Sequence, residues 1–168
     1  MAKIFSPLLR ASNHIVFVDP YFDPSHRKWQ RPLREFIRTT TDGNGRCPKF
    51  ELHFSLQGKD PNFSPGELVA ECEKQFAFEL PKRTSMKCVV WDRIPDEQRF
   101  HARFILTDLA GVASEHGLDE AGPDEEFEFF LMADGHCQAA IARFLEGGNG
   151  TYKLLAELLI DGRRDAAV

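Results

Sequence analysis

The chain has 168 residues, which is the length of one domain, and its 42% apolar and 28% charged residues are typical of a globular protein. This composition excludes disordered, collagen-like and coiled-coil chains, and a formal net charge of −5 excludes a chain-wide basic field for nucleic acid or anionic lipid. Because no apolar run approaches the roughly 20 residues of a membrane span, we expect a cytoplasmic protein with reduced cysteines. We expect one domain over residues 1–160 and a disordered tail over residues 161–168.

The first half of the chain alternates helical and strand patterns. Residues 14–18 form a β-branched and aromatic run that ends at Asp19-Pro20, which predicts a buried strand. Ser64 and Glu67 form the Ser-x-x-Glu pattern that begins a helix. The predicted elements, in order, are a short helix after Ser6-Pro7, the strand at 14–18, a helix that opens at Pro24-Ser25, a strand at 50–54, a helix from Ser64 to Leu80 and a strand at 86–91.

The second half carries clustered strand patterns and an acidic loop at residues 119–126. The expected elements are a strand at 100–106, a hairpin partner from Gly111, a strand at 127–132, a helix at 136–145 and a last element at 152–160, for which the leucine-rich composition favours a helix. Strands that alternate with helices and then cluster are typical of α/β proteins with a mixed β-sheet flanked by helices. We therefore predict that fold class.

One candidate binding position follows the strand at residues 14–18. Ligand sites in α/β sheets lie at the carboxyl ends of strands, where this chain carries Asp19 and Tyr21. These two side chains are therefore candidates for the wall of a site. The alternative is that Asp19 caps the turn that follows the strand, as Asp before Pro often does.

The segment from residue 100 to residue 108 carries the main candidate for chemistry. Strand alternation would place His101 and Arg103 on one face of the sheet, and a turn could bring Asp108 back towards them. Arg binds a phosphate with two parallel hydrogen bonds, and His can act as a nucleophile or a proton donor. The alternative is an ordinary surface face of an edge strand.

The helix after residue 24 is basic, and Arg27, Lys28 and Arg31 are its candidate binding residues. A solvated helix surface is one interpretation. Contact with nucleic acid or another polyanion is the other, with Trp29 and Tyr21 available for stacking. The acidic loop at 119–126 is interpreted as a solvated loop, and it could also pair with this basic face of a second copy.

Two further histidines are candidates for other roles. His53 alternates with Phe50 and Phe54 and is interpreted as a hydrogen-bonded histidine near the core rather than a ligand. His136-Cys137 has no partner pair at the spacing of a zinc site, so no metal is expected.

The segment His101-x-Arg103-x-x-x-x-Asp108 resembles the HxKxxxxD motif of the phospholipase D superfamily, with Arg in place of Lys. The chain is most similar to one branch, the phospholipase-D-like C-terminal domain of MIT-domain-containing proteins. Other blocks that resemble this branch follow in the same order, from about residue 4 to residue 144: Val18-Asp19-Pro20-Tyr21, Trp29-Gln30, Leu33-Arg34-Glu35-Phe36 and Gly117-Leu118-Asp119.

The resemblance implies a phospholipase-D-like mixed sheet with the His/Arg pair at a phosphate-recognising site. In active members the His attacks phosphorus, the Lys holds the phosphate oxygens and the Asp orients the His. By this resemblance His101, Arg103 and Asp108 would be the catalytic residues, with Asp119 as a second candidate to orient His101. Two motif copies meet at one site in the superfamily, and this chain has one copy, so a complete site implies a homodimer.

Three departures from the superfamily pattern affect the expected function. Arg replaces Lys at position 103, the Gly-Ser-x-Asn signature is absent, and Glu115, Asp119 and Glu120 would repel anionic lipid, so membrane binding is not expected. We expect a phosphate-recognising, catalytically reduced binding module that acts with partner proteins and needs no cofactor. The alternatives are a metal-independent phosphodiesterase or nuclease with a His nucleophile, active as a homodimer, and a plain interaction domain in which the His/Arg pair is a relict.

Overall fold

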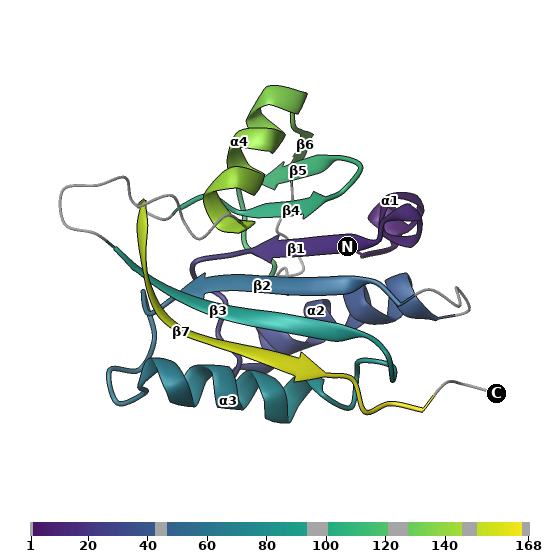
Figure 1. Ribbon diagram of the computed structural model, residues 1–168. Helices are drawn as coiled ribbons and strands as arrows, with labels where there is room; N and C mark the ends of the chain where they lie inside the picture. Colours follow the sequence, from purple (N-terminus) through teal and green to yellow (C-terminus); the bar gives the residue numbers. More distant parts are fainter. Residues whose placement is uncertain (1, 43–46, 94–100, 121–127, 146–150, 166–168) are drawn as a thin grey trace.

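The computed structural model describes residues 2–42, 47–93, 101–120, 128–145 and 151–165. Within these residues a mixed β-sheet carries helices on both of its faces, which confirms the predicted α/β class (Figure 1). The elements are η1 (Ala2–Phe5), α1 (Ser6–Ala11), β1 (His14–Val18), α2 (Arg27–Thr41), β2 (Lys49–Ser55), α3 (Pro65–Phe76), β3 (Ser85–Arg93), β4 (Phe104–Thr107), β5 (Gly111–Ser114), β6 (Phe129–Leu131), α4 (Asp134–Leu145) and β7 (Tyr152–Asp161).

The strand order in the described sheet is β6-β5-β4-β1-β2-β3-β7. The central strands β1, β2 and β3 are parallel, and each strand outside them is antiparallel to its neighbour. The parallel strands follow from the crossovers through α2 and α3, because a parallel pair needs a long connection. The antiparallel strands follow from short connections such as the turn between β4 and β5.

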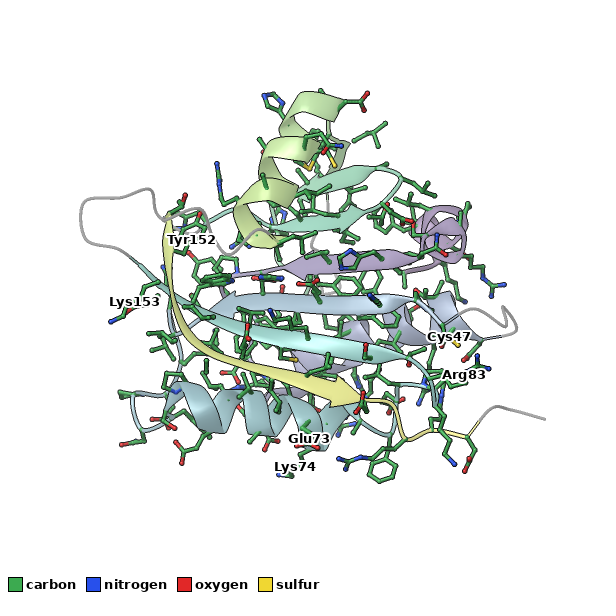
Figure 2. All side chains as sticks on the ribbon, in the orientation of Figure 1. Cys47, Glu73, Lys74, Arg83, Tyr152 and Lys153 are labelled. Atoms are coloured by element: carbon green, nitrogen blue, oxygen red, sulfur yellow. The ribbon has the colours of Figure 1, made fainter. Side chains whose placement is uncertain are left out.

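Two apolar cores lie on opposite faces of the sheet. One is packed by α2 and α3 and is rich in phenylalanine, with Phe17, Phe36 and Phe54 fully buried. The other lies under α4, where Phe144 packs among Val18 and other residues of the central strands. Polar side chains of α3, such as Glu73 and Lys74, point away from the sheet (Figure 2). This division explains why helix α3 has a single apolar stripe.

The last element is a strand, β7, and the expectation of a helix over residues 152–160 is wrong. β7 pairs antiparallel with β3 over the whole length of β3, and Tyr152 and Ile160 are buried near its ends. Tyr152 and Lys153 mark its beginning in Figure 2. The helical preference of leucine amounts to less than about 1 kcal/mol per residue, so the hydrogen bonds of the sheet and the burial of side chains decide the outcome.

The residues after β7 are docked on the domain, so the expectation of a disordered tail from residue 161 is wrong for residues 161–165. The backbone N–H of Gly162 donates to Thr84 at 2.9 Å, and that of Arg164 donates to Leu80 at 2.9 Å. The Arg164 guanidinium also pairs with Asp42 at 2.9 Å. Residues 166–168 lie outside the described part of the chain.

Across the described residues, the helices are all too short or too polar to cross a membrane. The four cysteines are free thiols, of which Cys47 is exposed and the other three are buried.

Candidate functional site

The main candidate residues gather at one end of the sheet. β1 and β2 are parallel, so their carboxyl ends and the loops that follow them meet there. β4 is antiparallel to β1, with Phe104 opposite Val18, so the residues that precede β4 reach the same end. The loop after β5 returns there as well, because Phe104 also pairs with Ala113.

Tyr21 brings His101 and Arg103 together. The Tyr21 hydroxyl is hydrogen-bonded to Nδ1 of His101 at 3.0 Å, and the guanidinium carbon of Arg103 lies 4.8 Å from the centre of the Tyr21 ring. His101 is exposed and Arg103 is half-buried. His101 and Arg103 therefore lie together at the end of the sheet where β1 and β2 end.

Strand alternation was expected to bring the two residues together, but it does not, because β4 begins only at Phe104. The partner of Phe104 is Val18, which is the last residue of β1, so the β1 side of the ladder ends there. The remaining pairing is a single hydrogen bond from the Ser114 N–H to the Arg103 carbonyl at 3.0 Å. Residue 100, which was also expected in this strand, lies outside the described residues.

Arg103 is held in place but keeps hydrogen-bonding capacity. Its Nη1 donates to the Glu115 carbonyl at 2.5 Å, and its Nε lies 4.0 Å from a carboxylate oxygen of Asp19. Nε is buried and finds no hydrogen-bond partner among the residues that the structure describes. A guanidinium carries five N–H donors, so donors remain for an anionic ligand.

Asp19 lies fully buried beneath this pair. Its carboxylate accepts hydrogen bonds from the backbone N–H of Tyr21 at 2.9 Å and of Leu118 at 2.7 Å. Burial raises the pKa of Asp19, against the opposing effect of these hydrogen bonds and of Arg103. Asp19 therefore does not form a wall of the site. It caps its own turn and holds the loop after β5, because it has no surface to offer a ligand.

A cleft of about 380 Å³ opens beside Arg103. Close packing of the loop after β5 shapes it, because a Cβ at Gly117 would lie 2.9 Å from the Trp29 ring and 3.0 Å from the Asp19 carboxylate. The lining residues are Tyr21, Lys28, Trp29, Arg103, Glu115, His116, Gly117 and Asp119.

The charges at the rim of the cleft are paired within the chain. Lys28 contacts Asp119 at 3.3 Å, and Arg31 contacts Glu120 at 3.1 Å. Asp119 and Glu120 of the acidic loop thus pair within the chain, and the other residues of that loop, 121–126, lie outside the described residues. The expected pairing with a second copy stays a prediction. Arg27 and Arg31 do not line the cleft. The basic face of α2 is thus largely neutralised where it meets the loop.

Asp108 lies at the opposite end of β4, so its predicted role of orienting His101 is wrong. Its carboxylate accepts from the backbone N–H of Asn13 at 3.0 Å, next to the beginning of β1. A strand advances roughly 3.3 Å per residue, so β4 separates Asp108 from His101 by its full length. Asp108 instead joins α1 to the end of β4.

Sequence reasoning missed Gln57 and Lys59, which follow β2 at the same end of the sheet. Gln57 Nε2 donates to the Tyr21 hydroxyl at 3.2 Å. Lys59 Nζ donates to the carbonyls of Gln57 at 3.2 Å and Pro20 at 3.4 Å, and burial lowers the pKa of Lys59 to about 8. The rule that sites lie at the carboxyl ends of parallel strands would have found both residues if it had been applied to the strand at 50–54.

His53 is a buried, hydrogen-bonded histidine, as the sequence predicted. Trp91 Nε1 donates to its Nδ1 at 3.0 Å, and its Nε2 lies 3.1 Å from Glu51. Burial lowers the pKa of His53. Over the described ranges, no group of three or more His, Cys, Asp or Glu side chains is arranged to hold a metal ion.

The site is thus a cleft with hydrogen-bond donors at the strand ends of a mixed α/β sheet. No protein-family model matches the chain, and a comparison with curated proteins finds no match either. The proposal for the function of this chain therefore rests on the geometry of the cleft and of the side chains around Tyr21.

Proposed function

We propose that this chain is a phosphate-recognising module of the phospholipase-D-like type, in which Arg103 and His101 bind the phosphate and no bond is cleaved. The convergence of these two side chains on Tyr21 carries the proposal. Arg103 offers N–H donors in a fork that matches phosphate oxygens, and a neutral or charged imidazole offers at least one more. We expect the module to act together with partner proteins.

Two other clefts fit a single phosphate less well. The cleft of about 420 Å³ between β6 and α4 has a mainly apolar lining that includes Phe130 and Met132. The cleft of about 370 Å³ between α1 and α2 is basic, but two of its arginines, Arg34 and Arg38, share the carboxylate of Glu79 at 3.2 and 2.9 Å. Their positive charge is already compensated, whereas Arg103 has its nearest carboxylate only at 4.0 Å.

The surroundings of His101 favour binding over catalysis. A His nucleophile needs a group that accepts from its second ring nitrogen, and in active relatives of the motif this group is a carboxylate. In the described residues the hydrogen-bond partner of His101 is the Tyr21 hydroxyl. Asp108 is at the far end of β4, and Asp119 pairs with Lys28.

Replacing Arg103 by Ala is expected to weaken the binding of inorganic phosphate by about tenfold to a hundredfold, because a hydrogen bond to a charged group contributes about 1.5–3 kcal/mol. An NMR titration with inorganic phosphate measures this. Backbone amide signals of the loop after β5, which holds Arg103 through Glu115, should shift in the native protein. Arg103→Lys should bind with intermediate affinity, since it keeps the charge but loses the planar fork.

The matched control is Arg38→Ala, which removes an arginine from the cleft between α1 and α2. Phosphate affinity should stay unchanged in this variant. Equal losses in the Arg103→Ala and Arg38→Ala variants would contradict the proposal, because the binding would then follow net charge and not the pair at Tyr21.

The second candidate function is a metal-independent phosphodiesterase or nuclease that is active as a homodimer. The exposure of His101 favours it, because no protein group is bonded to Nε2 of His101 within the described chain. Cleavage of a generic phosphodiester should then survive a chelator, disappear in His101→Ala and persist in Arg103→Lys. Activity that a chelator abolishes and His101→Ala leaves intact would reject this candidate, as would a monomeric mass by light scattering in an active sample.

A further inference from the structure

The Tyr21 hydroxyl lies between two side chains that constrain its single proton. Gln57 Nε2 donates to the hydroxyl oxygen at 3.2 Å, and His101 Nδ1 lies 3.0 Å from the same oxygen. An amide N–H can only donate, whereas a phenol has one proton to give and lone pairs to accept. With Gln57 as the donor, the phenol proton is directed to Nδ1 of His101.

The backbone holds Gln57 in this position although its side chain is exposed. The turn after β2 is closed by a hydrogen bond from the Lys59 N–H to the Leu56 carbonyl at 3.1 Å, and Gly58 within it has φ of 73°. The Gln57 N–H donates to the Ser55 hydroxyl at 3.1 Å, and Lys59 contacts its carbonyl. These hydrogen bonds fix the backbone of Gln57, from which its side chain reaches the Tyr21 hydroxyl.

We infer that Gln57 is a positioning residue that sets the tautomer of His101. If Nδ1 accepts a proton from Tyr21, the neutral imidazole carries its own proton on Nε2. Nε2 is the nitrogen without a described protein partner, so His101 presents a hydrogen-bond donor, and no nucleophilic lone pair, on the exposed side of Tyr21. The identity of the anion bound at His101 rests on the proposed function. A donor at Nε2 restricts the ligands of this site to anions that accept hydrogen bonds, such as phosphate. The absence of a nucleophilic lone pair at Nε2 explains why such an anion is bound and not cleaved.

The decisive variant is Gln57→Glu, which exchanges the amide for a carboxylate of nearly the same shape. A carboxylate only accepts, so the Tyr21 proton should turn towards it, and the Tyr21 oxygen should then accept from Nδ1 of His101. Nitrogen-15 NMR of the histidine rings at about pH 9, where histidine is neutral, distinguishes a protonated ring nitrogen from a bare one. We expect His101 to be protonated at Nε2 in the native protein and mainly at Nδ1 in Gln57→Glu.

Two further variants separate positioning from general effects. Gln138→Glu adds the same charge on the exposed side of α4 and should leave the His101 tautomer unchanged. Tyr21→Phe removes the hydroxyl, so in this background Gln57→Glu should no longer move the tautomer. The affinity for inorganic phosphate should fall about tenfold in Gln57→Glu, because one donor to the anion is lost.

The inference is overturned if native His101 is protonated at Nδ1, which would mean that the Gln57 amide turns its oxygen towards Tyr21. It is also overturned if Gln57→Glu leaves the tautomer as it is. These results are read in the free protein. Nε2 protonation without phosphate binding would therefore remove the proposed function and leave the tautomer inference standing. Phosphate binding that depends on Arg103, together with a His101 tautomer that Gln57→Glu does not change, would remove the tautomer inference and leave the proposed function standing.

Discussion

Asp19→Ala is expected to lower the free energy of unfolding by about 3 kcal/mol. The substitution leaves the buried N–H groups of Tyr21 and Leu118 without an acceptor, at about 1–3 kcal/mol each, and the removal of a buried charge recovers part of this cost. It also removes the carboxylate nearest to Arg103. Urea unfolding measures the loss, and the Leu118 amide signal should move in the folded variant.

Two other variants test whether this effect belongs to the buried carboxylate. Asp60→Ala removes an exposed carboxylate that also caps a turn, by accepting from the Asn62 N–H at 2.9 Å, and should cost less than about 1 kcal/mol. Asp19→Asn keeps one acceptor and should cost about half as much as Asp19→Ala. A loss below about 1 kcal/mol for Asp19→Ala would show that Asp19 does not hold the loop after β5.

Glu51→Gln is expected to lower the free energy of unfolding by up to about 3 kcal/mol at about pH 5, which lies below the ordinary pKa of histidine and above that of Glu51. Glu51 lies on the sheet face that α4 covers only in part, where it bridges His14 at 2.9 Å and His53 at 3.1 Å. Burial opposes its ionisation, but the hydrogen bonds and the charges of the two histidines outweigh burial and lower the pKa of Glu51 from 4.5 to about 2. A shift of this size corresponds to about 3 kcal/mol.

The sign of the pH dependence follows from this lowered pKa. Below pH 4.5 the unfolded chain takes up a proton that folded Glu51 does not, so its contribution is complete above pH 4.5 and is lost as the pH falls towards 2. The difference between native protein and Glu51→Gln should therefore vanish near pH 2. Glu157→Gln is the control on an exposed neighbour and should cost less than about 1 kcal/mol. A pH-independent difference for Glu51→Gln would contradict the account.

Local sequence patterns predicted the elements that short-range signals determine. The run at residues 14–18 became β1 with its expected limits, and the Ser64/Glu67 pattern became a capping box at the start of α3. β7 was missed because its leucine-rich composition favours a helix only weakly. Its strand conformation depends on β3, about sixty residues earlier in the chain, and no local pattern reports such a partner.

In the candidate site, too, the sequence predicted the residues that local strand patterns place and missed those that depend on contacts between distant segments. Tyr21, His101 and Arg103 were found because they follow or precede strands that meet at one end of the sheet. The role of Asp108 was assigned from motif spacing, although a strand between His101 and Asp108 must place them at opposite ends. Gln57 was missed because the strand-end rule was not applied to the strand at 50–54. The burial of Asp19 depends on how the loops after β1 and β5 pack against each other, which residue types alone do not determine.

The most direct test of phosphate recognition is a crystal structure of the protein soaked in tungstate, a heavy analogue of phosphate. We predict an anomalous peak for one bound tungstate, whose oxygens lie about 3 Å from the guanidinium of Arg103 and from Nε2 of His101. The peak should be absent in Arg103→Ala crystals soaked in the same way. Tungstate bound only in the basic cleft between α1 and α2, or nowhere near Arg103, would contradict the proposed function.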